Sequence, residues 1–210
     1  AVHGQKAYNG VALLSKSPLE DIRRGLPLLP DSGDGADEQA RYIEAVISGP
    51  EPVRVGCLYL PNGNPVATEK YAYKLAWMAR LNAHARDLLG LEERFVLTGD
   101  FNVIPEPRDA EFPKTWEGDA LFLPQTRAAF RALKNLGLTE AFLEADGAPG
   151  AYTFWDYQAG AWPRNNGIRI DHALLSPQAA DRLTGVSIHR DVRSWEKPSD
   201  HVPLVIELDL

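Results

Sequence analysis

The stretch RFVLTGDFN, residues 94–102, decides the fold and points to the chemistry of this chain. Its first part, Arg94–Thr98, is a short apolar run, which predicts a buried strand that stops at Gly99-Asp100. Asp100 and Asn102 stand two residues apart, so an extended chain places a carboxylate and an amide on one side. Such groups accept a proton from water, orient it or hold a metal. In isolation, a turn in which both side chains bond nearby backbone is the safer interpretation of this string.

The sequence on either side predicts further strands and two helices. Apolar or alternating runs predict strands over residues 8–15, 41–47, 53–60, 152–155, 168–175, 186–189 and 202–208. Apolar residues three or four apart predict a helix over Tyr73–Leu89, and a second helix is predicted over about Thr126–Leu136, with Gly137 as its stop. The proline-containing stretch Ser17–Pro30 is predicted to be a loop with short elements. We therefore expect an α/β (α+β) fold in which two sheets pack with helices outside, as one domain over residues 1–210.

The composition is that of a soluble globular chain. Its 210 residues are 44% hydrophobic, and 29 Asp and Glu outnumber 22 Lys and Arg, which gives a formal net charge of -7. This acidic balance argues against a protein that coats nucleic acid through charge alone, although most of the excess falls in residues 31–51 and 92–120. The single cysteine, Cys57, excludes a disulfide framework and a Cys-rich zinc site. No apolar run is long enough to span a bilayer, and we expect a cytoplasmic protein without a membrane partner.

Two further strings carry groups that take part in chemistry. In NNGIRIDH, residues 165–172, Arg169 and Asp171 share a face of the predicted strand, which in isolation fits an exposed ion pair. In KPSDHVP, just before the last predicted strand, Asp200 and His201 form a candidate acid–base or metal element, because histidine titrates near neutrality. A single histidine at such a position is more often structural.

The three strings in this order, each at a strand boundary, resemble the exonuclease III family of abasic-site endonucleases, within the endonuclease/exonuclease/phosphatase superfamily. Further matching strings are HGQK (3–6) with GVALL (10–14), YLPNG (59–63), YTFWDY (152–157) and EKPSDH (196–201). The Gly-Asp-x-Asn and Ser-Asp-His strings are typical of the superfamily. The Tyr-x-Pro-Asn-Gly, Phe-Trp-x-Tyr and Lys-Pro-Ser-Asp-His strings indicate the exonuclease III branch, and the resemblance covers the chain from His3 onward.

This resemblance implies a four-layer α/β sandwich and a DNA-repair nuclease. Family members hydrolyse the phosphodiester 5′ to abasic sites and degrade 3′ ends of duplex DNA by metal-assisted, in-line attack of water. By similarity, Asp100 activates or aligns that water and Asn102 positions it. His201, held by Asp171, would contact the scissile phosphate, and Tyr59 would lie near the leaving oxygen.

The resemblance also implies how the substrate is held. Asn62 would add a phosphate contact, and an apolar pocket would favour a missing base over a present one. Phe154 is expected to line that pocket, with Ile168 and Ile170 at the other lining positions. The expected partner is double-stranded DNA with an abasic site or a 3′ end, bound by a monomer that works in a bacterial-type cytoplasm, associated with the nucleoid.

The expected cofactor is Mg²⁺, with Mn²⁺ as a substitute. By the resemblance, Asp200 lies next to the metal, and Asp100 and Asn102 are further candidate ligands. The family pattern has a Trp/Phe-Asn-x-Asn strand and a Gln-Glu, whose Glu is the principal metal ligand, and neither string stands upstream of His3. We therefore expect this chain to lack about 55 N-terminal residues of the pattern, including its first strands, and to bind metal weakly or be inactive as it stands.

Two other functions stay open at this stage. One is a superfamily phosphatase or phosphodiesterase that acts on lipid or inositol phosphates, because such proteins share the Gly-Asp-x-Asn and Ser-Asp-His strings. The Tyr-Thr-Phe-Trp and Lys-Pro-Ser-Asp-His contexts of this chain argue against it. The other is a non-catalytic scaffold, which the absent Glu favours and the retained Asp100, Asn102, Asp171, Asp200 and His201 oppose.

Overall fold

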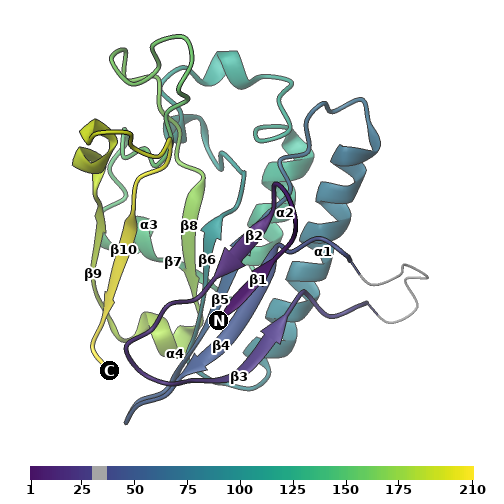
Figure 1. The fold of residues 1–210 in the computed structure, drawn as a ribbon, viewed down its shortest axis with the longest axis vertical. Helices are drawn as coiled ribbons and strands as arrows, with labels where there is room; N and C mark the ends of the chain where they lie inside the picture. Colours follow the sequence, from purple (N-terminus) through teal and green to yellow (C-terminus); the bar gives the residue numbers. More distant parts are fainter. Residues whose placement is uncertain (30–36) are drawn as a thin grey trace.

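The centre of the computed structural model is a six-stranded mixed sheet, and the structure describes residues 1–29 and 37–210 (Figure 1). The strands lie in the order β3-β4-β5-β6-β8-β7. Their bounds are Leu19–Arg24 (β3), Tyr42–Ile47 (β4), Val53–Tyr59 (β5), Phe95–Asp100 (β6), Asp171–Leu175 (β8) and Thr139–Glu140 (β7). β5 and β6 run parallel, and the other neighbouring pairs run antiparallel. A parallel pair needs a long crossover, and here the crossover contains a helix.

The predicted strand in residues 94–102 is confirmed as β6, between β5 and β8. Phe95, Val96 and Leu97 are all buried, because both faces of the sheet are covered at this strand. A strand that is buried on both sides reads as a continuous apolar run, which is the pattern seen in the sequence. The strand continues to Asp100 and so places that carboxylate at the C-terminal end of β6, where β5 also ends.

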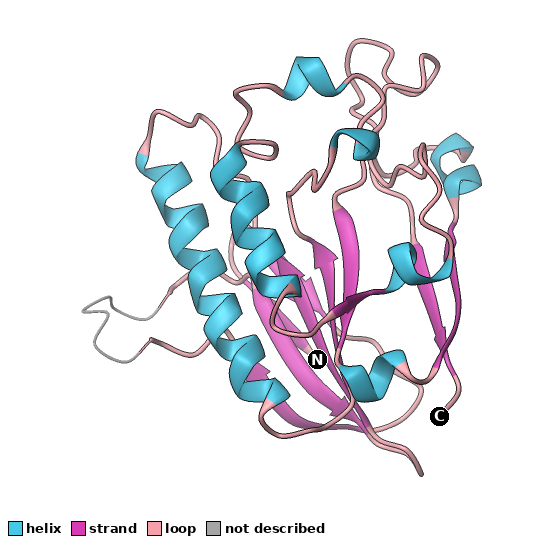
Figure 2. Ribbon diagram, turned by 180° about the vertical axis from the view of Figure 1, so that it is seen from behind, coloured by secondary structure: helices cyan, strands magenta, loops and turns pink. Residues whose placement is uncertain are grey.

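Two long helices, α1 (Glu69–Leu89) and α2 (Pro124–Lys134), cover one face of the sheet (Figure 2). The predicted helix over Tyr73–Leu89 is confirmed but begins earlier, at Glu69. Thr68 caps its N-terminus by accepting a hydrogen bond from the backbone of Lys70, and the exposed polar first turn gives no apolar signal. α2 begins at Pro124 because the fixed φ of proline suits a first helical turn.

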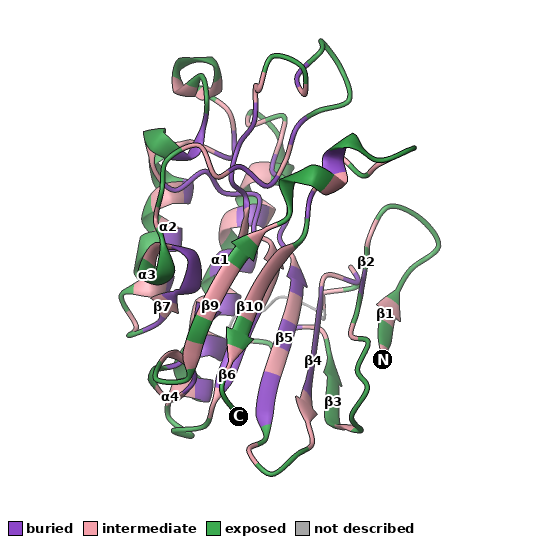
Figure 3. Cartoon of the chain, turned by 90° about the vertical axis from the view of Figure 1, so that its left-hand side faces the viewer, coloured by how far each residue is buried: buried purple, intermediate pink, exposed green. Residues whose placement is uncertain are grey.

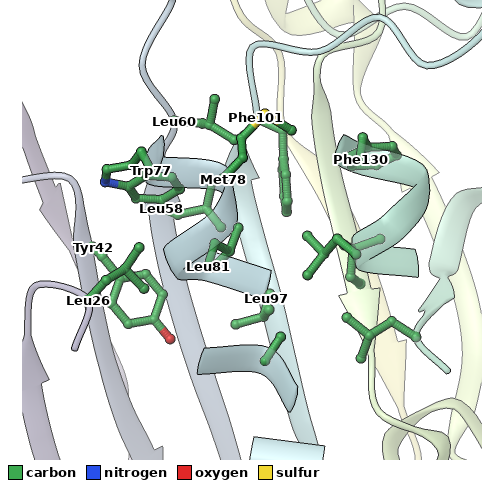
Figure 4. Close-up of a cluster of buried hydrophobic side chains, with 14 of the residues drawn as sticks. Leu26, Tyr42, Leu58, Leu60, Trp77, Met78, Leu81, Leu97, Phe101 and Phe130 are labelled. Carbon is green, nitrogen blue, oxygen red and sulfur yellow. The ribbon is translucent and has the colours of Figure 1, made fainter. Parts of the chain in front are cut away.

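The main core lies between this helix pair and the sheet (Figure 4). Alternate residues of the strands, such as Leu58 and Leu97, point toward the helices, where Trp77, Met78 and Leu81 of α1 meet them. The predicted spacing of three or four residues therefore marks the buried stripe of α1. Phe130 on α2 completes the layer.

The opposite face of the sheet meets a hairpin of β9 (Leu183–Ile188) and β10 (Leu204–Leu208), which pair antiparallel (Figure 3). Val96 and Ala173 point to this side, since successive side chains of a strand alternate between faces. An apolar cleft separates part of the hairpin from the sheet. It is lined by Ile47, Val53, Val55, Val96, Thr98, Leu204, Ile206, Leu208 and Leu210. Two packed sheets with helices against them agree with the predicted fold class.

The remaining elements are short. A second hairpin pairs β1 (Val2–Gly4) with β2 (Gly10–Ala12). The short helices are α3 (Ala141–Ala145), α4 (Pro177–Ala180) and the 3-10 turns η1 (Pro107–Asp109), η2 (Pro113–Trp116) and η3 (Arg190–Ser194). Within the described part of the chain, no helix has the length and apolarity needed to cross a membrane.

Three predicted elements differ from the structure. Ser17–Pro30, predicted as a loop with short elements, contains the six-residue edge strand β3, which pairs with β4 and is held by ion pairs of Arg23 and Arg54 with Asp21. The buried strand predicted over residues 8–15 shrinks to β2, where only Val11 of the three residues is buried, because the hairpin lies at the surface. Residues 152–155 form no regular strand, because Phe154 makes isolated bridges to Ile168 and His201 where loops cross.

Candidate active site

Three strand ends place polar side chains side by side at one edge of the central sheet. Tyr59 is the last residue of β5 and lies in register with Asp100, the last residue of β6. Asp100 lies in register with Asp171, the first residue of the antiparallel β8. Strand pairing alone therefore brings together a phenol and two carboxylates that are far apart in the sequence.

The turn after β6 attaches an amide to this row. Asn102 donates from its backbone to Asp100 Oδ1 at 2.8 Å and from its side chain to Asp100 Oδ2 at 2.9 Å. The same amide group also donates to the carbonyl of Leu60 at 2.9 Å, and Asn62 donates to Asn102 Oδ1 at 3.1 Å. Asn102 has φ +47, a left-handed conformation that asparagine tolerates better than most residues. The predicted Asp100–Asn102 pair is thus a folded unit that also includes Asn62.

His201 joins the site from the loop before β10. Its Nδ1 lies 2.8 Å from Asp171 Oδ2, and its Nε2 lies 4.0 Å from Asp100 Oδ2. Burial opposes protonation of the ring, but the hydrogen bond and charge of Asp171 outweigh it, with help from Asp100 and Asp200, and raise the pKa of His201 to about 9. The imidazole is therefore a cation at neutral pH and presents Nε2–H as a donor.

Asp100 is poised between its charged and neutral forms. Burial and the negative charge of Asp171 raise its pKa to about 7, against the opposing effects of His201, the Asn102 backbone N–H and Lys74. A carboxyl group with a pKa near the working pH suits proton exchange with water. Burial also raises the pKa of the Tyr59 hydroxyl, as does the charge of Asp100, so this phenol keeps its proton at neutral pH.

These residues open into a cavity of about 440 Å³. Its lining contains Tyr59, Asn62, Asn64, Asp100, Asn102, Trp116, Asp119, Leu121, Phe154, Asp156, Ile170, Asp200 and His201. One wall is polar and the other, formed by Phe154, Leu121 and Ile170, is apolar. The ring of Phe154 stands edge-on to His201 with centroids 5.0 Å apart. The cavity thus combines an acid–base cluster with a hydrophobic surface.

Ile168, expected to line the apolar pocket, does not reach the cavity. It is 1% exposed and packs in a core cluster with Ile104 and Ala110. Its backbone bridges Phe154 and Ala110, which turns the side chain inward. Ile170, two residues on, is the isoleucine that meets the cavity.

Arg169 also differs from the sequence interpretation of an exposed ion pair. It is 2% exposed and donates to Asp109 Oδ1 at 2.9 Å and to Glu140. His172 Nδ1 contacts the same Glu140 carboxylate at 3.0 Å. Although burial favours the neutral acid, His172 and Arg169 hold the pKa of Glu140 far below its usual range. This buried network fixes the start of β8 and with it the position of Asp171.

Comparison with known proteins agrees with this geometry. Residues 1–201 match the Endonuclease/Exonuclease/phosphatase family. The chain belongs to this family. It is 34% identical to exodeoxyribonuclease III of Haemophilus influenzae, over 98% of this chain and 78% of that protein.

Solved structures within the Endonuclease/Exonuclease/phosphatase family superpose closely. The 3′ phosphatase NExo from Neisseria, bound to a product DNA hairpin, gives a TM-score of 0.92 at 38% identity, covering 100% of this chain and 79% of that one. An AP endonuclease from Archaeoglobus fulgidus gives 0.90 at 34% identity, with the same two coverages. The chain is therefore of the exonuclease III type, and the predicted α/β sandwich is confirmed.

Nucleases of the Endonuclease/Exonuclease/phosphatase family generally depend on a divalent metal, and the carboxylates of Asp100 and Asp200 would supply part of its oxygen ligands. Asp100 and Asp200 both line the cavity. Burial first and the negative charge of Asp171 second raise the pKa of Asp100, and a cation would offset that charge. Asn102 donates its amide N–H to Asp100, and its side-chain oxygen accepts a hydrogen bond from Asn62. That oxygen is therefore occupied by a hydrogen bond and is not available to a metal. Within residues 1–29 and 37–210, no group of three or more His, Cys, Asp or Glu is arranged as a metal site.

The structure adds residues that sequence reasoning missed. A second groove, lined partly by Arg41, Lys70 and Tyr73, adjoins the cavity and shares Asn62 and Asn64 with it. Lys74 lies directly under the site. The sequence did offer a signal for Lys74, because it is a charged residue on the apolar stripe of a predicted helix. The groove had no such signal, because only the fold brings its segments together.

Proposed function

We propose that this exonuclease III-type protein cleaves the phosphodiester bond 5′ to abasic sites in duplex DNA and removes nucleotides from 3′ ends. The observation that carries the proposal is the convergence of Asp100 and the His201–Asp171 pair on one cavity that also has an apolar wall. A phosphodiester needs donors for its charged oxygens and a base for water. A sugar without its base needs an apolar surface.

His201 serves as the phosphate contact. Protonated at neutral pH, its ring donates from Nε2 to a non-bridging phosphate oxygen, while Nδ1 stays hydrogen-bonded to Asp171. Asp171 thereby orients the ring and keeps it charged as the transition state gains negative charge. Asp100 lies on the other side of Nε2 and accepts the proton of the attacking water.

The amides and the phenol complete the donor set. Asn102 fixes both oxygens of Asp100. Asn62 donates one amide hydrogen to Asn102 Oδ1 and is exposed beside the cavity, so its second amide hydrogen is available for a phosphate. Tyr59 keeps its proton and stands next to Asp100, where it can donate to the leaving oxygen. Mg²⁺, held by Asp200 with Asp100, would supply positive charge to the phosphate when bound.

The surroundings of the cavity fit a polynucleotide better than a small phosphate ester. Phe154 and Ile170 offer an apolar face to the abasic sugar. The adjoining groove carries Arg41 and Lys70, whose charges can follow a backbone away from the cleaved bond. A local basic groove is compatible with the overall acidic charge, because binding depends on the charges near the phosphates.

The test compares four substrates with the same protein in Mg²⁺. They are a labelled duplex with a tetrahydrofuran abasic analogue, an undamaged duplex with a recessed 3′ end, a duplex with a 3′ phosphate, and phosphoinositide vesicles. We expect incision at the abasic analogue and shortening of the recessed end, both lost in EDTA and in Asp100→Asn. Asp87→Asn, an exposed carboxylate on α1 that does not line the cavity, is the matched control.

Each alternative has a distinct outcome. Phosphate release from vesicles without DNA cleavage would replace the proposal by a lipid or inositol phosphatase. Binding of the abasic duplex with no turnover in Mg²⁺ or Mn²⁺ would favour the non-catalytic scaffold. Removal of the 3′ phosphate alone would confine the activity to DNA 3′ ends.

A further inference from the structure

Helix α1 contributes one polar side chain to the underside of the site. Lys74 is 0% exposed and lies three and four residues before Trp77 and Met78, on the apolar stripe. Lysine is almost never fully buried unless it has partners. Its Nζ donates to the backbone carbonyl of Asn102 at 2.6 Å and to that of Asn62 at 3.1 Å. Both partners belong to the site described above.

The two carbonyls belong to different turns. Asn62 follows β5 and Asn102 follows β6, and their side chains meet at 3.1 Å. The left-handed backbone at Asn102 is a conformation that the surrounding structure has to hold. Nζ of Lys74 donates to the backbone carbonyl of Asn102 and to that of Asn62, so it connects the two turns on the side that faces α1. The side-chain amides of the two asparagines connect the turns on the side that faces the cavity.

Gly63 leaves the space that this arrangement needs. It has φ +89, and a Cβ at this position would stand 2.7 Å from Cδ of Lys74 and 3.1 Å from Cβ of Ala120. A side chain here would displace the lysine stem or the turn. The glycine therefore lets the Asn62 turn lie directly on Lys74.

The charge of Lys74 faces the site rather than an ion-pair partner. Within the residues that the structure describes, no salt bridge joins Nζ to a carboxylate. Burial lowers the pKa of Lys74 to about 7, against the attraction of Asp100 and Asp119. A lysine kept only for stability would gain more from a paired carboxylate, whereas here both donated bonds end on residues of the site.

We propose that Lys74 is a positioning residue for the hydrolysis: it holds the turns after β5 and β6 so that Asn62 and Asn102 keep Asp100 aligned. The proposal rests on the nuclease function proposed above. It predicts that losing the two bonds slows the chemical step and leaves duplex binding nearly intact, because the substrate-facing side chains are all still present. A misplacement of about 1 Å costs roughly 100-fold in rate.

The experiment uses Lys74→Met, which keeps the stem and removes the donors, in steady-state incision of the abasic-analogue duplex. We expect kcat to fall about 100-fold and KM to change by less than about threefold. Arg86→Met, on the exposed side of the same helix, should match the parent in both constants. Circular dichroism and urea unfolding establish that each variant is folded. If Lys74→Met does not fold, Lys74→Gln, which keeps one amide donor, replaces it and should give a smaller fall in kcat.

A double-mutant cycle separates positioning from a general structural effect. In the Asn102→Ala background we expect Lys74→Met to lower kcat by less than about threefold, because both changes disturb one unit. Independent, multiplicative losses would overturn the proposal, as would parent-like kcat in Lys74→Met. A parent protein that cleaves none of the DNA substrates would instead refute the nuclease function itself, and with it this proposal.

Discussion

Replacing Asp171 by asparagine removes the charge that keeps His201 protonated and leaves an acceptor of nearly the same shape. The pKa of His201 is about 9, against an ordinary value of 6.5, and the hydrogen bond and charge of Asp171 are the main favourable causes. That gap corresponds to roughly 3 kcal/mol, at about 1.4 kcal/mol for each pH unit. Asp100 and Asp200 supply part of this stabilisation. We therefore expect Asp171→Asn to lower the free energy of unfolding by roughly 2 kcal/mol and to bring the pKa of His201 below about 8.

The pH dependence follows from the direction of the shift. A histidine whose pKa is raised by folding contributes its full stability below its unfolded pKa of about 6.5, and the contribution disappears as the pH rises through about 9. The free energies of unfolding of the parent and Asp171→Asn should therefore differ most at about pH 6 and converge at about pH 10. At high pH a neutral His201 no longer attracts Asp171, so the parent loses its advantage over the variant.

The assay is a titration of the His201 imidazole nitrogens by NMR in metal-free buffer, together with urea unfolding at the two pH values. Asp200→Asn is the matched control, because its charge is the smallest of the named contributions and should move the pKa less. The reasoning would be refuted by an Asp171→Asn protein in which His201 still titrates near pH 9. A stability difference as large at pH 10 as at pH 6 would also contradict it.

Three other outcomes follow from the structure. Asp100→Ala and His201→Ala should each lower turnover on abasic duplex by several orders of magnitude with little change in fold, and activity within about tenfold of the parent would remove those roles. The affinity for duplex should fall as salt rises, measured by fluorescence anisotropy, because Arg41 and Lys70 displace counterions from phosphates; a flat response would exclude that groove as the binding surface. Leu81→Ala, at a position 1% exposed, should lower the free energy of unfolding by about 3 kcal/mol in urea titrations, and a loss below about 1 kcal/mol would contradict the packing of α1.

Some parts of the fold could be predicted from the sequence because their signal is local. The apolar run before Asp100 has strand propensity and ends in a glycine, and the stripe on α1 has a helical period. β3 was not readable, since its charged residues are stabilised by ion pairs with β4 and β5 that depend on pairing. Ile168 and Ile170 likewise look the same in sequence, and only the bridges at Ile168 decide which of them meets the cavity.

By itself the sequence determined the family and the identity of the groups in the site, because Gly-Asp-x-Asn, Arg-x-Asp and Ser-Asp-His each occur with their neighbours at a strand boundary. The tertiary structure alone decided how these groups act on one another. Registry across β5, β6 and β8 places Tyr59, Asp100 and Asp171 in a row, and a loop returns His201 to it. Burial and the charge of Asp171 then raise the pKa of Asp100 to about 7, and Asp171 raises the pKa of His201 to about 9 against the effect of burial. Both shifts depend on distance and solvent exclusion, which no linear string encodes.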